Sequence, residues 1–358
     1  MSTRATPQSI TSENVAIEKT PLAKSSAQRI SALDFTKGAL VLIMVLYHWI
    51  NYFVGPQWPY YFYLRFLTPS FIFITGFMVS HVYLSKYDPA DSRLVKRLLV
   101  RGLKLIAIFV ALNLARILVL PILSSARLVT SPLTADNFVT IFVTGNLPTT
   151  SKLVSFSILV PIAYLLMLSG ALMVPYRFFK YTFHVTCALL LLFIAGLAWN
   201  DIRSLNLEFL TIGMIGVLIG FAPIAALNKL VRHPLALAFT YICYLGAITV
   251  WNVPFSLLIV GVCLNVMVIY LMGVSWDEMN KIRGEVVLLG KYSLFGYISQ
   301  IAVLQLLHAM LRYFEPEMWV LVISFVASFA LTIVSVELVD RARAASRNAD
   351  KLYKAVFA

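Results

Sequence analysis

Charged side chains are scarce in this sequence. Asp, Glu, Lys and Arg make up 13% of the 358 residues, whereas 60% are apolar. An average soluble domain carries about twice that share of charge, roughly 25%. The scarcity of charge therefore excludes a soluble globular domain. Several apolar runs approach the ~20 residues that a helix needs to cross a hydrocarbon core.

Cysteine is also scarce. The three cysteines, Cys187, Cys243 and Cys263, lie in apolar runs and at no spacing typical of metal ligands. We interpret them as packing residues, which predicts no metal site and leaves the redox compartment open.

Acidic residues are fewer than basic ones, 16 against 29, for a net charge of +13. Most basic residues fall on alternate connections between the apolar runs, which predicts a multi-pass protein of the cell membrane, bacterial inner membrane by preference, with both termini cytoplasmic. Anionic lipid accounts for the charge without a nucleic-acid partner. The basic segments on the predicted cytoplasmic side are 4–29, 86–104, 177–180, 229–232, 281–291 and 341–354.

The apolar runs do not alternate with polar residues, which argues against a β-barrel. The sequence therefore predicts an all-α integral membrane protein, a bundle of about ten transmembrane helices. The expected spans are 35–54, 62–85, 98–121, 153–175, 181–199, 206–224, 235–252, 254–273, 287–311 and 318–339.

Three parts follow from this pattern: a disordered cytoplasmic tail at 1–29, a transmembrane domain at 30–340 and a cytoplasmic tail at 341–358. The connection 124–152 is expected outside; its apolar patch 137–145 is too short to cross a bilayer and would dip into it or cap the bundle.

Small residues recur four apart at two places: Gly76 with Ser80, and Gly216 with Gly220. This spacing is typical of close contacts between membrane helices, so we interpret these residues as packing positions.

Two ionisable residues, Lys37 and His48, lie eleven positions apart in the first apolar run. Eleven steps of about 100° make three turns plus about 20°, so the side chains share a helix face and lie about 16 Å apart along the axis. Asp34 falls near the same face. Ionisable groups inside a span are costly and usually mark a functional pathway.

The same segment resembles the integral-membrane acyltransferase family 3, whose first span carries Arg or Lys followed, after ten intervening residues, by His. The matching residues are Arg29, Leu33, Asp34, Lys37, Gly38 and His48. Further resemblance lies in Ser70–Tyr83, Arg97–Lys104 and Leu289–Gln300. Membrane glucan succinyltransferases and the lysosomal heparan N-acetyltransferase type share similar first-span patterns.

The resemblance implies that His48 is catalytic, as a general base or a transient acyl carrier, and that Lys37 helps to orient the acyl donor. We interpret Asp34, near the same face, as a third candidate catalytic residue. Imidazole suits a base because its pKa lies near working pH. Structural alternatives stay open for each residue: His48 as an interfacial histidine, Lys37 reaching the headgroups, and Asp34 closing a capping box with Ser31.

The basic cluster at 93–104 opens the third span. Arg97, Arg101 and Lys104 recur at i, i+4 and i+7 on one stripe of a helix. Guanidinium groups bind phosphate oxygens well, and coenzyme A carries several phosphates. With the resemblance, Arg97 and Arg101 become candidate donor-binding residues; membrane anchoring is the alternative.

Polar residues also mark one stripe of the ninth expected span: Ser293, Tyr297, Gln300 and His308. Ser293 and Tyr297 match the family pattern, whereas Gln300 stands where the family frequently has His. We interpret Ser293, Tyr297 and Gln300 as candidate substrate or oxyanion residues. Hydrogen bonding between helices is the alternative.

Together these features predict an O-acyltransferase. It would move an acyl group, acetyl or succinyl, from cytoplasmic acyl-coenzyme A to a hydroxyl, or less favourably an amine, of a surface or exported glycan or glycolipid. Acyl-coenzyme A is then a donor substrate, and no resident cofactor is expected. A transporter or flippase is one alternative, although no internal symmetry between halves supports it. A degenerate family member that acts as a binding or assembly subunit is the other, because Gln300 departs from the family pattern.

Overall fold

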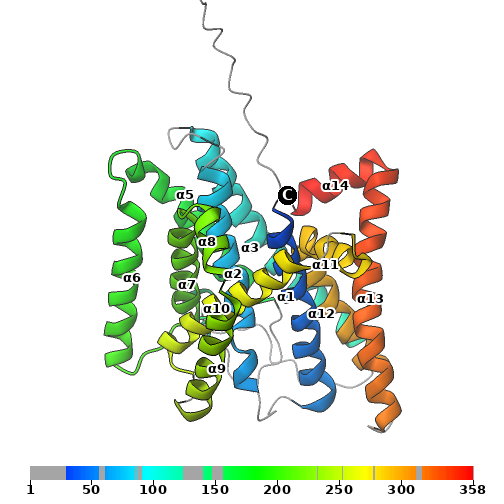
Figure 1. Ribbon diagram of the computed structural model, residues 1–358. Coiled ribbons are helices and arrows are strands. Elements are labelled where there is room, and N and C mark those ends of the chain that lie inside the picture. The colour runs from blue at the N-terminus through cyan, green and yellow to red at the C-terminus, as the bar shows by residue number, and fades with distance from the viewer. Residues whose placement is uncertain are drawn as a thin grey trace, which may run out of the picture.

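The computed structural model describes residues 30–55, 61–84, 87, 91–123, 140–146, 156–231, 233–251, 253–276, 279–311 and 317–357. Its regular elements over these ranges are all helical, with no strand among them, which confirms the all-α prediction (Figure 1). The tail at 1–29 lies outside the described residues.

The helices are given in chain order. They are α1 (Ser31–Trp49), η1 (Ile50–Val54), η2 (Tyr61–Leu64), α2 (Leu67–Met78), η3 (Val79–Leu84), α3 (Ser92–Leu123), α5 (Leu159–Tyr176), α6 (Thr182–Trp199), α7 (Leu205–Gly220), α8 (Ile224–Val231), α9 (Pro234–Trp251), α10 (Phe255–Ser275), α11 (Lys281–Lys291), α12 (Ser293–Leu311), α13 (Met318–Ala345) and α14 (Arg347–Phe357).

Within the described ranges, 9 helices are long and apolar enough to cross a membrane, and α7 is a shorter apolar helix. The prediction of a multi-span membrane protein is thereby confirmed. Two expected spans need correction. The span 206–224 ends at Gly220, shortly before Pro223, because the residue before a proline is disfavoured in a helix. The span 287–311 is two helices, α11 and α12, with Tyr292 between them.

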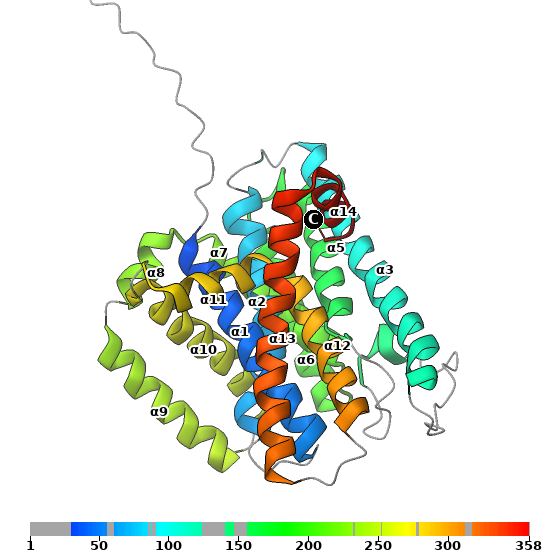
Figure 2. The ribbon, with the colours of Figure 1, turned by 90° about the vertical axis from the view of Figure 1, so that its right-hand side faces the viewer.

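Helix α1 lies at the centre of the bundle and packs against α2, α10, α11, α12 and α13. In the most apolar 18-residue stretch of the first span, 50% is buried inside the protein. The corresponding share for α9, which stands at the edge of the bundle in Figure 2, is 17%. A peripheral helix that is apolar all round faces lipid rather than water.

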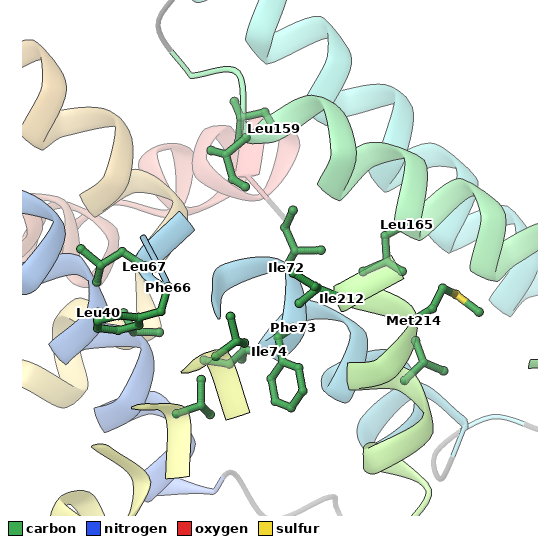
Figure 3. Close-up of a cluster of buried hydrophobic side chains, with 14 of the residues drawn as sticks. Leu40, Phe66, Leu67, Ile72, Phe73, Ile74, Leu159, Leu165, Ile212 and Met214 are labelled. Atoms are coloured by element: carbon green, nitrogen blue, oxygen red, sulfur yellow. The ribbon is translucent and has the colours of Figure 1, made fainter. Parts of the chain in front are cut away.

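The apolar core joins α1, α2, α5 and α7. Figure 3 shows Leu40 of α1 near Phe66 and Leu67, with Ile72 of α2 reaching toward Ile212 of α7. Leu40 and Ile72 are completely buried. This core holds α1 and α2 in place against the helices behind them.

Backbones approach closely where α2 crosses α7. A Cβ atom added at Gly76 would lie 1.9 Å from the Gly213 carbonyl oxygen, and one added at Gly216 would lie 2.2 Å from the Phe73 carbonyl oxygen. Ser80 donates a hydrogen bond of 2.6 Å to the Val217 carbonyl. The packing prediction for these small residues is confirmed, because any larger side chain would force the helices apart.

Part of the expected external connection is described, at 140–146. It packs onto the bundle: Tyr164 Oη donates to the Phe142 carbonyl at 2.8 Å, and Asn206 Nδ2 donates to the Ile141 carbonyl at 2.8 Å. Of the two alternatives for the apolar patch, this contact favours a cap on α5 and α7.

Candidate active site

A cavity of about 320 Å³ opens at the end of the bundle where α1 begins and α13 ends, the upper end in Figure 1. Four basic side chains line it: Lys37, Arg101, Lys104 and Lys291. No Asp or Glu is among the lining residues. We call this space the basic cavity; its charge suits an anionic ligand.

Lys37 reaches the basic cavity from α1. Its Nζ lies 2.6 Å from Asp34 Oδ1, and the two side chains are 18% and 6% exposed. Asp34 therefore pairs with Lys37. The N-cap of α1 is Ile30 rather than Ser31, and its side chain makes no capping hydrogen bond, which does not favour the capping-box alternative. The pair holds the ammonium group in position at the cavity wall.

Only two of the three basic residues in the stripe on α3 line the basic cavity. Arg101 and Lys104 line the basic cavity, and the Arg101 guanidinium stacks over the Tyr83 ring at 5.6 Å. Arg97, one turn nearer the start of α3, is exposed; it donates to Tyr87 Oη and lies over that ring. Arg97 lies outside the cavity lining, at the approach to it.

The sequence pattern identifies Lys291 only as one of the basic residues that indicate topology, yet Lys291 lines the basic cavity. The break between α11 and α12 places it there. Lys291 Nζ lies 3.0 Å from Asp340 Oδ1 on α13, and Tyr292 Oη donates to the same carboxylate at 2.5 Å. Predicting that the helix ends at Lys291 and a new one begins at Ser293 would have placed Lys291 at this end of the bundle.

Two glycines bring α11 against α1 beside the cavity. A Cβ atom at Gly38 would lie 1.8 Å from the Val286 carbonyl oxygen, and one at Gly290 would lie 1.6 Å from the Asp34 carbonyl oxygen. Only glycine permits such an approach. The contact sets Lys37 and Lys291 on adjoining walls of the same cavity.

The polar stripe of α12 extends from the cavity into the bundle. Ser293 and Tyr297 line the cavity, and the Tyr297 ring lies 6.3 Å from Phe71 and 6.0 Å from Phe156. Gln300, three residues further, is completely buried, and neither atom of its amide has a hydrogen-bond partner among the described residues. A buried, unsatisfied amide is costly, which marks Gln300 as a group available to a ligand.

His48 lies deeper along α1 than the basic cavity and is not among its lining residues. Its ring meets Tyr47 edge-on at 5.0 Å, and Tyr47 Oη donates to Tyr61 Oη at 3.0 Å. Because α1 is one continuous helix from Ser31 to Trp49, Lys37 and His48 do share a face, as their spacing predicts.

The relative depth of these groups follows from the pairing of α1 with α12. A Cβ atom at Gly296 would lie 3.4 Å from Val41, and His308 lies 5.5 Å from the Tyr52 ring, so the helices run side by side in the same direction. Gln300 is then about 6 Å and His48 about 10 Å beyond the Gly296–Val41 level. Gln300 lies at a depth between Tyr297 and His48.

Metal chemistry has no evident ligand set in the described part of the chain, where no three His, Cys, Asp or Glu side chains gather. A polyanionic ligand, in contrast, would meet the four basic groups of the basic cavity. The site thus combines a cavity lined by basic side chains with a buried polar stripe that leads toward a histidine.

The fold and the site define a multi-span membrane protein with a basic cavity at one end. Residues 29–126 match the model of a family described as heparan-alpha-glucosaminide N-acetyltransferase, catalytic. The matched stretch contains Lys37, His48 and Arg101, whereas α11 and α12 lie outside it. No curated protein and no solved structure matches the chain.

The expected likeness to a membrane acyltransferase is therefore confirmed in part. Over its first spans the chain is similar to a membrane acetyltransferase catalytic domain of the heparan type. The finer assignment to acyltransferase family 3 is a prediction that this match does not carry.

Proposed function

We propose that this protein is a membrane acyltransferase that binds an acyl-coenzyme A in the basic cavity and transfers the acyl group to a glycan or glycolipid acceptor. The observation that carries the proposal is the cavity itself, with Lys37, Arg101, Lys104 and Lys291 in its lining and no carboxylate among the lining residues. The phosphates of coenzyme A match this charge. The family match, named for N-acetyl transfer, favours acetyl as the group transferred.

In this mechanism the basic side chains hold the phosphates, and the pantetheine arm extends along α12 past Ser293 and Tyr297. The rise from Lys37 to His48, about 16 Å, is comparable with the length of an extended pantetheine arm. The thioester would then lie at the depth of Gln300 and His48. Binding of the distant phosphates orients the reacting carbonyl group.

His48 acts as the general base. It removes the proton from the acceptor hydroxyl or amine as the oxygen or nitrogen attacks the thioester carbonyl carbon. Tyr297 Oη and Gln300 Nε2 donate to the developing oxyanion. The carbon–sulfur bond then breaks, and the leaving thiolate takes the proton from the imidazolium, which restores neutral His48 and releases coenzyme A as a thiol.

We place the basic cavity on the cytoplasmic side, where acyl-coenzyme A is available, with both chain ends on that side. The bias of basic residues toward this end supports the placement. In a cysteine-free background, Ser346→Cys, between α13 and α14, should be labelled only from the cytoplasm. Asn200→Cys, between α6 and α7, should be labelled only from outside, and the opposite pattern would reverse the direction of transfer.

A transfer assay tests the function. Purified protein in nanodiscs receives isotopically labelled acetyl-coenzyme A and two matched acceptors, an oligosaccharide ending in glucosamine and the same oligosaccharide ending in glucose. Mass spectrometry should show one added acetyl group on at least one of them, and the pair distinguishes N- from O-transfer. An intact thioester with neither acceptor modified would contradict the proposal, and passage of an unmodified solute across the membrane of sealed proteoliposomes holding the same protein would indicate a transporter.

A further inference from the structure

Helix α14, expected to be part of a cytoplasmic tail, forms one wall of the basic cavity. Three of its side chains, Tyr353, Val356 and Phe357, are among the lining residues. Figures 1 and 2 show α14 lying across the end of the bundle, next to the end of α13. Tyr353 and Phe357, one helical turn apart, are half-buried on its inner face, whereas Leu352 points outward and is 67% exposed.

An ionic clip holds α14 in this position. Asp350 accepts hydrogen bonds from Arg343 Nη2 at 2.6 Å and Nε at 3.0 Å, and from Lys354 Nζ at 2.6 Å. The Arg343 guanidinium also lies over the Tyr353 ring at 4.2 Å and over the Tyr292 ring at 5.2 Å. The turn at Ser346 is thereby fixed from both sides, so α14 has a defined place beside the cavity.

Aromatic rings gather where α14 meets the start of α12. Tyr353 lies 5.3 Å from Tyr292, edge to face, and 5.0 Å from Phe357, which lies 5.8 Å from Phe295. The same cavity is lined by Arg101 and Lys104 of α3. Its mouth therefore combines aromatic rings with cations.

This combination matches the chemistry of a nucleotide. Aromatic side chains stack on purine rings, and guanidinium and ammonium groups bind the attached phosphates. The part of a coenzyme A thioester that would lie at the mouth of the cavity is the phosphorylated adenosine, since the acyl end must extend inward along α12.

We propose that α14 recognises the adenine nucleotide of the thioester donor, with Tyr353 as the principal stacking residue. This inference rests on the proposed function and adds a specificity element to it. A donor that lacks the nucleotide, such as acetyl-N-acetylcysteamine, presents the same thioester but has nothing for α14 to bind. The effect of α14 should therefore depend on the donor.

The experiment compares Tyr353→Ala with Leu352→Ala, a matched change of the neighbouring, outward-pointing residue on the same helix. For Tyr353→Ala the KM for acetyl-coenzyme A should rise about tenfold, the size expected for loss of one base–aromatic stack. The KM for acetyl-N-acetylcysteamine should stay unchanged. Leu352→Ala should change neither value, and Tyr353→Phe, which keeps the ring, should retain the affinity of the native protein.

An equal rise of KM for both donors would mean that Tyr353 only maintains the fold and would overturn the inference, as would no change for either donor. If the native protein transfers from neither thioester, the proposed function fails. In that event calorimetry with coenzyme A on the same purified proteins still decides about α14: an unchanged Kd in Tyr353→Ala contradicts nucleotide recognition.

Discussion

Lys37 and His48 lie on one face of the same helix, yet the protein surrounds them with different chemistry. Lys37 faces a cavity together with three other basic side chains and is paired with Asp34. His48 lies beside Tyr47, outside the cavity lining, at a depth where Trp49 donates to Ser324 and packs on Phe325. One end is cationic and open; the other is aromatic.

The contrast indicates a division of labour along α1. Under the proposed function, the charge at the Lys37 end binds a polyanion and contributes affinity, whereas the His48 end offers imidazole groups, His48 itself and His308 beside Tyr52, among aromatic rings. An imidazole in such surroundings contributes little to binding a charged donor. Substitutions at the two ends should therefore affect different kinetic constants.

The largest effect is expected at the His48 end. His48→Gln preserves a hydrogen-bonding side chain but removes the base, so kcat should fall by about 100-fold or more while the donor Kd stays the same. Transfer is measured with labelled acetyl-coenzyme A, and donor binding by calorimetry. His184→Gln, an exposed histidine on peripheral α6, is the control and should keep full activity. Near-normal turnover by His48→Gln would show that the base lies elsewhere.

Substitutions at the Lys37 end should weaken donor binding and leave kcat almost unchanged. The double variant Arg101→Ala with Lys104→Ala should raise the donor Kd by about 100-fold or more, because each of the two charge-assisted bonds is worth about 1.5–3 kcal/mol. At saturating donor, kcat should change little. Arg93→Ala with Lys96→Ala removes the same charge from the exposed start of α3, outside the cavity lining, and should leave Kd unchanged. Equal Kd values for the two double variants would remove the basis for a donor site.

A change at the contact of α11 with α1 should disturb both functions together. Gly290→Ala puts a methyl group 1.6 Å from the Asp34 carbonyl oxygen, so the helices must separate at a cost of about 1–3 kcal/mol or more. Thermal unfolding in detergent should show a lower Tm. Gly284→Ala on the same helix meets no atom within 4 Å and should be neutral or stabilising by up to about 1 kcal/mol. If both variants unfold at the native Tm, the close contact does not exist in the membrane.

The smallest effect is expected from weakening the ionic clip of α14. The clip lies at the Lys37 end of the bundle, so His48 should not be affected. Hydrogen bonds from Lys354 and Arg343 hold the pKa of Asp350 below its ordinary value of 3.8. A carboxylate with a lowered folded-state pKa contributes its stabilisation above the ordinary pKa and loses it as pH falls through the lowered value. Docking of α14 should therefore be constant near neutral pH and weaken only in acid.

Asp350→Asn should reproduce the acid state at pH 7. Hydrogen exchange in 347–357 should become faster, with no change near His48. Asp201→Asn, an exposed carboxylate at the far end of the bundle, is the control and should leave exchange in α14 as it is. Unaltered protection of α14 in Asp350→Asn would mean that the aromatic contacts alone hold the helix.

Much of the fold follows from composition and periodicity. Scarce charge and runs near 20 apolar residues determine an all-helical membrane protein, because in lipid every backbone polar group must be satisfied within its own segment. Helical spacing alone places Lys37 and His48 on one face, and the small residues of α2 and α7 mark a close crossing, both as observed.

Only the tertiary structure decided which basic residues gather around one cavity. Arg97 and Arg101 are equivalent in the sequence pattern, yet Arg101 lines the cavity and Arg97 does not, since the cavity that α3 shares with α5, α12 and α14 extends along only part of α3. Lys291 and Tyr353 join the site from positions 254 and 316 residues after Lys37, and α11 ends at Lys291 where a continuous span was expected. Local periodicity reports the faces of single helices; which faces meet depends on contacts between distant segments, and those are formed only when the bundle packs.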